Sequence, residues 1–192
     1  MQARMQIARA TTMARMQRAR VVPSAVQSLA GPSGDDKSQL VKRLLNAKEA
    51  TGKSFTQIAQ ELGCTNVYAA QLFYNQSQLK QGQAAALKKA VPSITDEDMA
   101  HMMRAPTRRF DPALLQEPAI YRLYEAIMHG GDALKALINE ECGDGIMSAI
   151  DFYCDVDTMP GKHGEKRVVI TLNGKYLPFV AQTQEDNVAR RQ

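Results

Sequence analysis

The feature that most constrains the fold is a change of sequence period at Gly143-Asp144-Gly145. Within residues 121–150, apolar residues before this triplet recur every three or four positions, as on a helix. After it they alternate with polar residues, as on a strand, and the expected apolar face holds Ile150, Phe152, Cys154 and Val156. A helical segment followed by β structure predicts an α+β fold.

Two helices are expected ahead of the change of period. Pro118 suits the first turn of a helix, where its missing N–H has no helical partner to lose. Gly130-Gly131 predicts the end of that helix. Asp132 then predicts the N-cap of a second helix that runs up to Cys142.

Short strands are expected after the change of period. Residues 159–165 have the composition of a loop, and Lys166–Leu172 has the composition of a strand. Asn173-Gly174 predicts a two-residue hairpin turn into a further strand at Lys175–Leu177. So small a sheet is marginally stable alone. We therefore expect the short strands to form an intertwined sheet in a two-fold, strand-exchanging dimer.

The N-terminal half carries a series of capped helical patterns, which predict an all-α bundle. Ser54 and Gln57 form a capping-box signature, Thr65 suits an N-cap, and Thr95 with Asp98 predicts a second capping box. The expected helices are 37–51, 54–63, 65–74, 83–91 and one that begins after Thr95.

Helix, glycine turn and helix form the outline of a helix-turn-helix, which raises the possibility of DNA binding. However, no lysine or arginine occurs between Ser54 and Leu79. Phosphate and guanine contacts depend chiefly on those two residue types. Gln71 or Asn75 could contact a base, but nothing would anchor the helix to the backbone. The module is interpreted as a helix-turn-helix-like packing domain without a nucleic-acid partner; a helix-turn-helix DNA-binding regulator with a C-terminal dimerisation domain is the alternative function.

The net charge of +4 comes from the N-terminus. Residues 1–34 contain five arginines and no acidic residue, and without them 19 basic residues stand against 20 acidic ones. An arginine-rich, acid-free leader is similar to a mitochondrial presequence; a disordered extension is the other interpretation. The sequence contains no apolar run that predicts a membrane span. We expect a cytoplasmic or mitochondrial protein that is not secreted and has no membrane partner.

The cysteines and histidines predict neither a disulfide framework nor a metal site. Three widely spaced cysteines fit a reducing compartment better than an oxidising one. The histidines share no metal-ligand spacing with them or with one another. These residues are Cys64, Cys142, Cys154, His101, His129 and His163.

Arg122, Glu125 and Ser148 are the candidate catalytic residues. Arg122 and Glu125 are three positions apart in an expected helix, so their side chains share one face. Ser148 follows the change of period. An arginine, a carboxylate and a hydroxyl suit a small anion, because arginine keeps its charge when it is removed from water. The spacing alone is also typical of an ordinary surface ion pair.

Several blocks between about Lys37 and Phe179 resemble the cyanase family, also called cyanate hydratase or cyanate lyase. These blocks are Tyr121-Arg122-Leu123-Tyr124-Glu125, Leu134-Lys135-Ala136-Leu137-Ile138, Gly143-Asp144-Gly145-Ile146-Met147-Ser148-Ala149-Ile150 and Leu172-Asn173-Gly174-Lys175-Tyr176-Leu177-Pro178.

The resemblance implies a bicarbonate-dependent decomposition, and so detoxification, of cyanate to ammonia and carbon dioxide through carbamate. It maps the family's catalytic arginine, glutamate and serine onto Arg122, Glu125 and Ser148. It also implies that no metal or organic cofactor is needed, and that dimers assemble into a homodecamer with active sites between subunits.

The expected organisation has five parts. They are a leader at 1–34, a helical N-terminal domain at 37–104, a linker at 105–117, a catalytic and oligomerisation domain at 118–180 and a polar tail at 181–192.

Overall fold

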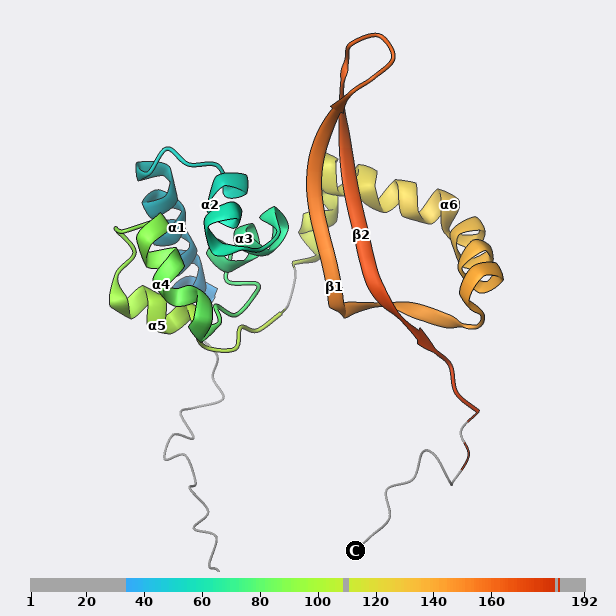
Figure 1. Cartoon of the computed structure of the whole chain (residues 1–192), viewed down its shortest axis with the longest axis horizontal. Coiled ribbons are helices and arrows are strands. Elements are labelled where there is room, and N and C mark those ends of the chain that lie inside the picture. Colours follow the sequence, from blue (N-terminus) through green and yellow to red (C-terminus); the bar gives the residue numbers. More distant parts are fainter. Residues whose placement is uncertain (1–33, 109–110, 182, 184–192) are drawn as a thin grey trace, which may run out of the picture. The chain divides into compact units, whose positions relative to one another are not determined.

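The computed structural model describes residues 34–108, 111–181 and 183. Residues 1–33 of the expected leader and nearly all of the polar tail lie outside the described residues. Helices are followed by an antiparallel sheet, so the predicted α+β class is confirmed (Figure 1). The elements are α1 Gly34–Ala50, α2 Phe55–Leu62, α3 Asn66–Phe73, α4 Gln81–Ala90, α5 Asp96–Met102, the 3-10 helix η1 Pro112–Gln116, α6 Pro118–Cys142, β1 Gly145–Pro160 and β2 Lys166–Pro178.

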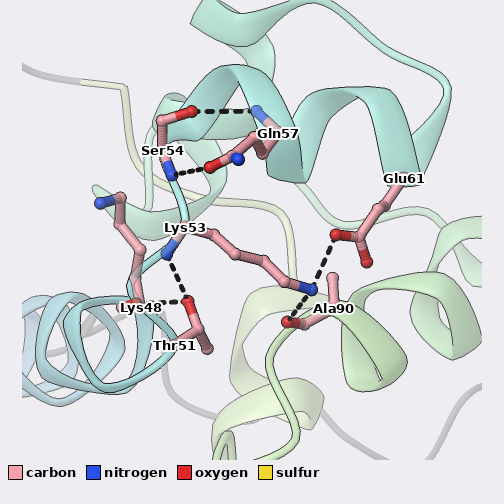
Figure 2. Close-up of polar contacts among 7 residues, drawn as sticks. All are labelled: Lys48, Thr51, Lys53, Ser54, Gln57, Glu61 and Ala90. Carbon is pink, nitrogen blue, oxygen red and sulfur yellow. Dashed lines mark hydrogen bonds and ion pairs between the residues drawn. The ribbon is translucent and has the colours of Figure 1, made fainter.

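Local signals begin and end α2 and α3 as expected. Ser54 Oγ accepts the Gln57 N–H at 3.2 Å, and the Gln57 side chain accepts the Ser54 N–H at 2.8 Å (Figure 2). The predicted capping box is therefore confirmed. Gly63 ends α2 in the left-handed region, with φ 66°. Thr65 caps α3 by accepting the N–H of Tyr68 at 3.1 Å.

Lys53 connects the start of α2 to the end of α4 (Figure 2). Its ammonium donates to the carbonyl of Ala90 at 3.0 Å and lies 2.7 Å from the carboxylate of Glu61. Because the C-terminus of a helix carries a partial negative charge, a cation at this position is favourable. Lys53 therefore helps to hold α2 against the C-terminal end of α4.

The helices α1 to α5 enclose one hydrophobic core. Phe73 is fully buried and makes an edge-to-face contact with the ring of Phe55, with 5.6 Å between ring centroids. Met99 and Met102 fill gaps in the same core. The buried members of the cluster are Leu40, Leu44, Ile58, Leu62, Leu72, Phe73, Leu79, Leu87, Ala90, Val91, Ile94, Met99 and Met102.

The prediction of two helices between Pro118 and Cys142 is wrong. α6 is continuous across this range. Gly130 and Gly131 lie inside it and do not have positive φ angles. Glycine in a helix interior costs only about 1 kcal/mol relative to alanine, so a strong apolar stripe can carry the helix through it. The glycine pair therefore marks a weaker point in the helix and not its end.

The prediction of three short strands is also wrong. β1 and β2 form a long antiparallel pair in which Asn173-Gly174 lies inside β2, opposite Phe152 and Tyr153. Neither residue of this dipeptide has the positive φ angle that a two-residue hairpin turn of this kind requires. The chain turns instead between Gly161 and Glu165, where the N–H of Gly161 donates to the carbonyl of Glu165 at 2.7 Å.

Alternation along β1 is interrupted between Met147 and Phe152. Phe152 and Cys154 are half-buried, in keeping with the expected apolar face, but Val156, which was expected on the same face, is 41% exposed. Ile150 was expected on that face, but it is 97% exposed. The expectation was wrong because the register shifts at this point and breaks the two-residue period.

α6 and the hairpin expose much apolar surface, and α6 has no buried residue. Within the described residues, no helix is both long and apolar enough to cross a membrane. The large apolar side chains left at the surface of α6 are Tyr121, Leu123, Tyr124, Ile127, Met128, Leu134 and Leu137, and those of β1 and β2 include Ile146, Met147, Ile150, Tyr153, Val156, Met159, Val168, Ile170, Leu172 and Leu177.

Only half of the second predicted capping box forms. Thr95 Oγ1 accepts the N–H of Asp98 at 3.0 Å. The carboxylate of Asp98, however, accepts a hydrogen bond from Arg43 in α1, with 2.7 Å between Nη2 and Oδ1. A capping box depends on the longer side chain of Glu or Gln, which explains the failure. The bond from Arg43 holds the pKa of the buried Asp98 carboxyl below its ordinary value.

We expect this ion pair to make folding stability sensitive to acid. Because the Asp98 pKa is lowered by folding, the unfolded chain binds more protons at this site. The stabilisation is therefore present above the ordinary aspartate pKa of about 3.9 and is lost as the pH falls through the lower, folded value. Thermal unfolding of wild type and Asp98→Asn should show a difference in midpoint that shrinks as the medium is acidified.

Asp96→Asn is the matched control, because the Asp96 side chain is 97% exposed in its ion pair with Lys88. Its midpoint should stay close to that of wild type at every pH. A wild-type advantage over Asp98→Asn that does not change between about pH 6 and about pH 2 would contradict the role of the Arg43 pair.

Candidate active site

Arg122 and Glu125 form an ion pair in the first turns of α6. The Glu117 carboxylate caps this helix by accepting the N–H of Ile120 at 2.9 Å. Arg122 Nη1 donates to Glu125 Oε2 at 2.5 Å. The arginine side chain is 71% exposed and that of the glutamate 30% exposed. The glutamate is thus the less exposed partner, and it holds one edge of a guanidinium whose remaining N–H groups can bind an anion.

The ring of Tyr121 gives the guanidinium a second support. The Arg122 Cζ atom lies 5.6 Å from the ring centroid of Tyr121. Attraction between a cation and an aromatic face at this range is worth about 0.5–1 kcal/mol at an exposed site. The ring and the Glu125 carboxylate together restrict the orientation of an otherwise mobile side chain.

Ser148 lies at the irregular part of β1 and is 6% exposed. Its Oγ accepts the backbone N–H of Ile150 at 3.0 Å and that of Asp151 at 3.1 Å. The hydroxyl therefore stabilises the backbone turn in which it lies. Serine hydroxyls often bond to nearby backbone groups in this way, so these bonds alone would also fit a purely structural serine.

The structure brings Arg122 and Glu125 together and leaves Ser148 apart from them. Ser148 hydrogen-bonds neither side chain within the described part of the chain. Arg122 and Glu125 lie in the first turns of α6, whereas Ser148 lies near the start of β1, six residues after the end of that helix.

Lys135 supplies positive charge where α6 meets β1. Its ammonium donates to Asn139 at 2.8 Å, to the carbonyl of Gly145 at 3.2 Å and to Asp144 at 3.4 Å. These bonds fix the entry into β1, the strand that carries Ser148. The i, i+4 spacing of Lys135 and Asn139 indicates the first contact, but nothing in the sequence pattern indicates the other two.

The ring of Tyr176 in β2 packs closely against Gly145 at the start of β1, just after the C-terminus of α6. Burial raises the pKa of the Tyr176 hydroxyl, and nearby Cys142 and Asp144 add to the effect. A Cβ on Gly145 would collide with this ring and with the carbonyl of Leu177. Gly145 is therefore required for β1 to start beside β2.

The thiols have the character of packing residues. Burial raises the pKa of Cys64, and burial together with Asp155 raises that of Cys154. A raised pKa disfavours the thiolate that a nucleophile or metal ligand requires. All three cysteines are free, and no cluster of three or more His, Cys, Asp or Glu residues able to hold a metal occurs in the described ranges.

Comparison with known proteins relates this chain to enzymes that act on cyanate. Residues 112–181 match the family model described as the cyanate lyase C-terminal domain. Arg122, Glu125 and Ser148 all lie within this match.

Curated relatives and a solved structure extend the similarity over most of the chain. Cyanate hydratase of Phaeodactylum tricornutum is 55% identical over 150 residues, which cover 78% of each chain. Cyanate hydratase of Arabidopsis thaliana is 53% identical over 154 residues, which cover 80% of this chain and 92% of that one. The crystal structure of cyanase from T. urticae aligns with a TM-score of 0.63 at 30% identity and covers 73% of this chain and 97% of that chain. Such identity over most of both chains shows that this chain belongs to the cyanate hydratase, or cyanase, family.

Proposed function

We propose that this protein is a cyanate hydratase, which decomposes cyanate with bicarbonate to ammonia and carbon dioxide. The observation that carries the proposal is its 53–55% identity to two cyanate hydratases over about four fifths of its length. The paired Arg122 and Glu125 and the buried Ser148 supply a suitable set of charged and hydrogen-bonding groups. Under this proposal the protein removes cyanate and releases its nitrogen.

The proposed reaction joins two anions that repel each other in water. An oxygen of bicarbonate bonds to the electrophilic carbon of cyanate and gives the carboxycarbamate dianion. This dianion takes up a proton on nitrogen, loses carbon dioxide by cleavage of the C–O bond between the former bicarbonate carbon and the bridging oxygen, and leaves carbamate. Carbamate takes up another proton and separates into ammonia and a second carbon dioxide. The steps involve no change of oxidation state, and we propose that they require neither a metal nor an organic cofactor.

Arg122 is the residue best suited to hold both anions. Its guanidinium stays charged at every physiological pH and presents donors in a planar fork. Fixing two reactants beside each other removes much of the entropic cost of their encounter. Oriented positive charge then stabilises the dianion that forms. We assign this role to Arg122, with Ser148 as a hydrogen-bonding partner of the substrate.

Glu125 has a positioning role in this proposal. An unpaired carboxylate would repel both substrates, but Glu125 Oε2 is bonded to Arg122 at 2.5 Å. The pair occupies one edge of the guanidinium and leaves its other N–H groups oriented and able to donate. Glu125 therefore sets the direction of the arginine and does not bind the substrates itself.

We further propose that the active site is completed between copies of the chain. Within one chain, Ser148 hydrogen-bonds to backbone N–H groups and not to Arg122, and the Arg122 side chain is 71% exposed. α6 has no buried residue, and the hairpin leaves many large apolar side chains exposed. Burial of apolar surface is worth about 25 cal/mol per Å², so these faces favour association with further copies. Dimers that assemble into a decamer would satisfy this requirement.

The helix-turn-helix alternative gains no support from the described residues. The loop and helices around Gly63 pack as a helical module, and residues 54–79 still offer no lysine or arginine for phosphate contacts. The family relationship is to enzymes. We therefore propose no nucleic-acid partner.

The compartment is a separate proposal. We propose a cytoplasmic or mitochondrial location, which is supported by the arginine-rich, acid-free residues 1–34 and by three free cysteines.

The activity is tested by incubating purified full-length protein with cyanate in the presence and absence of bicarbonate. Ammonia and carbon dioxide should form together, and their release should depend on bicarbonate. An enzyme assay at limiting bicarbonate should give about two carbon dioxide molecules for each ammonia, as the reaction requires. If neither product forms under either condition, the proposed function is wrong.

Arg122→Lys tests the forked geometry of the arginine. The variant keeps the charge but loses the planar set of donors, so we expect kcat/KM to fall by about a hundredfold or more. Arg167→Lys is the matched control, because Arg167 also pairs with a carboxylate, that of Glu165, at 3.3 Å at the end of the hairpin. This control should retain wild-type turnover. Equal activities of the two variants would argue against the role of Arg122.

Ile127→Asp tests the proposed contact between copies. Ile127 shares one stripe of α6 with Leu123 and Leu134 and is 49% exposed in the single chain. A charge in a buried interface is costly, so the variant should dissociate to smaller species in analytical ultracentrifugation. Ala136→Asp places the same side chain on another side of α6 and should not dissociate the assembly. A wild-type protein that sediments as a 21.2 kDa monomer would refute the proposal at once.

A further inference from the structure

The irregular stretch of β1 places several residues of one strand against very few of the other. Met147 pairs with Tyr176, and Phe152 pairs with Gly174. The intervening residues of β1, from Ser148 to Asp151, therefore lie opposite Lys175 alone. Such a bulge redirects side chains locally and is common next to functional sites.

The hydroxyl of Ser148 closes this bulge by accepting two hydrogen bonds. Its donors are the N–H groups of Ile150 and Asp151, at 3.0 and 3.1 Å. A serine hydroxyl has two acceptor lone pairs and one proton. With both lone pairs used by the backbone, the proton is the group left for any further partner. The geometry therefore makes Ser148 a hydrogen-bond donor.

Gly174 makes room for this arrangement from the opposite strand. A Cβ at position 174 would overlap the carbonyl oxygen of Ser148 and the Cγ of Met147. The φ angle of Gly174 is not positive, so the position needs a small residue for space and not for an unusual backbone conformation. A glycine within a strand commonly marks such a close approach of two backbones.

We propose that Gly174 is a positioning residue for the reaction. Its missing side chain lets β2 lie against the Ser148 backbone, which keeps the hydroxyl bonded to Ile150 and Asp151 and directs its proton to an electronegative atom of cyanate or of the dianion. The proposal rests on the proposed function. It predicts that Gly174 affects turnover only through the hydroxyl of Ser148.

The kinetic test compares Gly174→Ala, Ser148→Ala and the double variant. Gly174→Ala should lower kcat at least about tenfold, with a smaller change in KM, because the donor is misplaced and the anion-binding arginine is not. In the Ser148→Ala background, the same change should alter kcat less than about twofold. Wild-type turnover in Gly174→Ala, or a further tenfold loss in the double variant, would overturn the proposal.

Gly82→Ala is the control for adding a methyl group to a glycine. Gly82 lies in α4 with no atom within 4 Å of an added Cβ, so turnover should remain at the wild-type level. Sedimentation of every variant verifies assembly. If Gly174→Ala does not assemble, Met147→Ala/Gly174→Ala replaces it, because this pair of changes removes the side-chain overlap and leaves only the carbonyl overlap.

Amide hydrogen exchange provides a second test, which does not depend on turnover. Ser148→Ala should speed exchange at Ile150 and Asp151 by about tenfold or more, since both N–H groups lose their acceptor. Gly174→Ala should also speed exchange at the amides of Ile150 and Asp151. Unchanged exchange in these variants would overturn the proposal, even if the wild type decomposes cyanate. If both variants lose protection at these amides but the wild type does not turn over cyanate, only the proposed function is refuted, and the positioning of the Ser148 hydroxyl by Gly174 stands.

Discussion

The structure depends on an unequal distribution of apolar burial between the two halves of the described chain. The helices α1 to α5 bury a core that runs from Leu40 to Met102. α6 buries none of its residues in the single chain, and a two-stranded hairpin is only marginally stable by itself. This inequality supports the proposed association of copies through α6 and the hairpin. The residues assigned to the proposed function, Arg122, Glu125 and Ser148, lie on this same half of the chain.

The local sequence predicted helix starts well because each start depends on a few adjacent residues. Ser54, Thr65 and Thr95 all accept a backbone N–H three positions later, as their residue types and spacing indicated. The Asp98 half of its expected capping box could not be predicted in this way. Its carboxylate bonds to Arg43, a residue 55 positions away, and no local pattern contains that information.

Two errors in the fold prediction, the division of α6 and the hairpin turn at Asn173-Gly174, came from glycine. Gly130 and Gly131 permit a helix end, but the helix continues through them because its apolar stripe continues. Asn173-Gly174 has the composition of a hairpin turn, yet Gly174 is required by the nearness of the Ser148 carbonyl. One residue type serves turns, left-handed caps and close contacts, and only the three-dimensional neighbours distinguish these uses.

The candidate site was predicted in part. The spacing of Arg122 and Glu125 indicated their ion pair, which the structure contains. The two backbone bonds to Ser148 depend on a bulge that has no sequence signature in this chain. Catalytic roles for the three residues stay predictions, as do the boundaries of the expected domains.

The exposed apolar surface of α6 and the hairpin also bears on inheritance. If active sites form between copies, as proposed, each polypeptide would serve more than one catalytic centre. A single defective copy would then disable centres to which healthy copies also contribute. In a cell that makes both forms, such an allele would act dominantly, with damage out of proportion to its share of the protein.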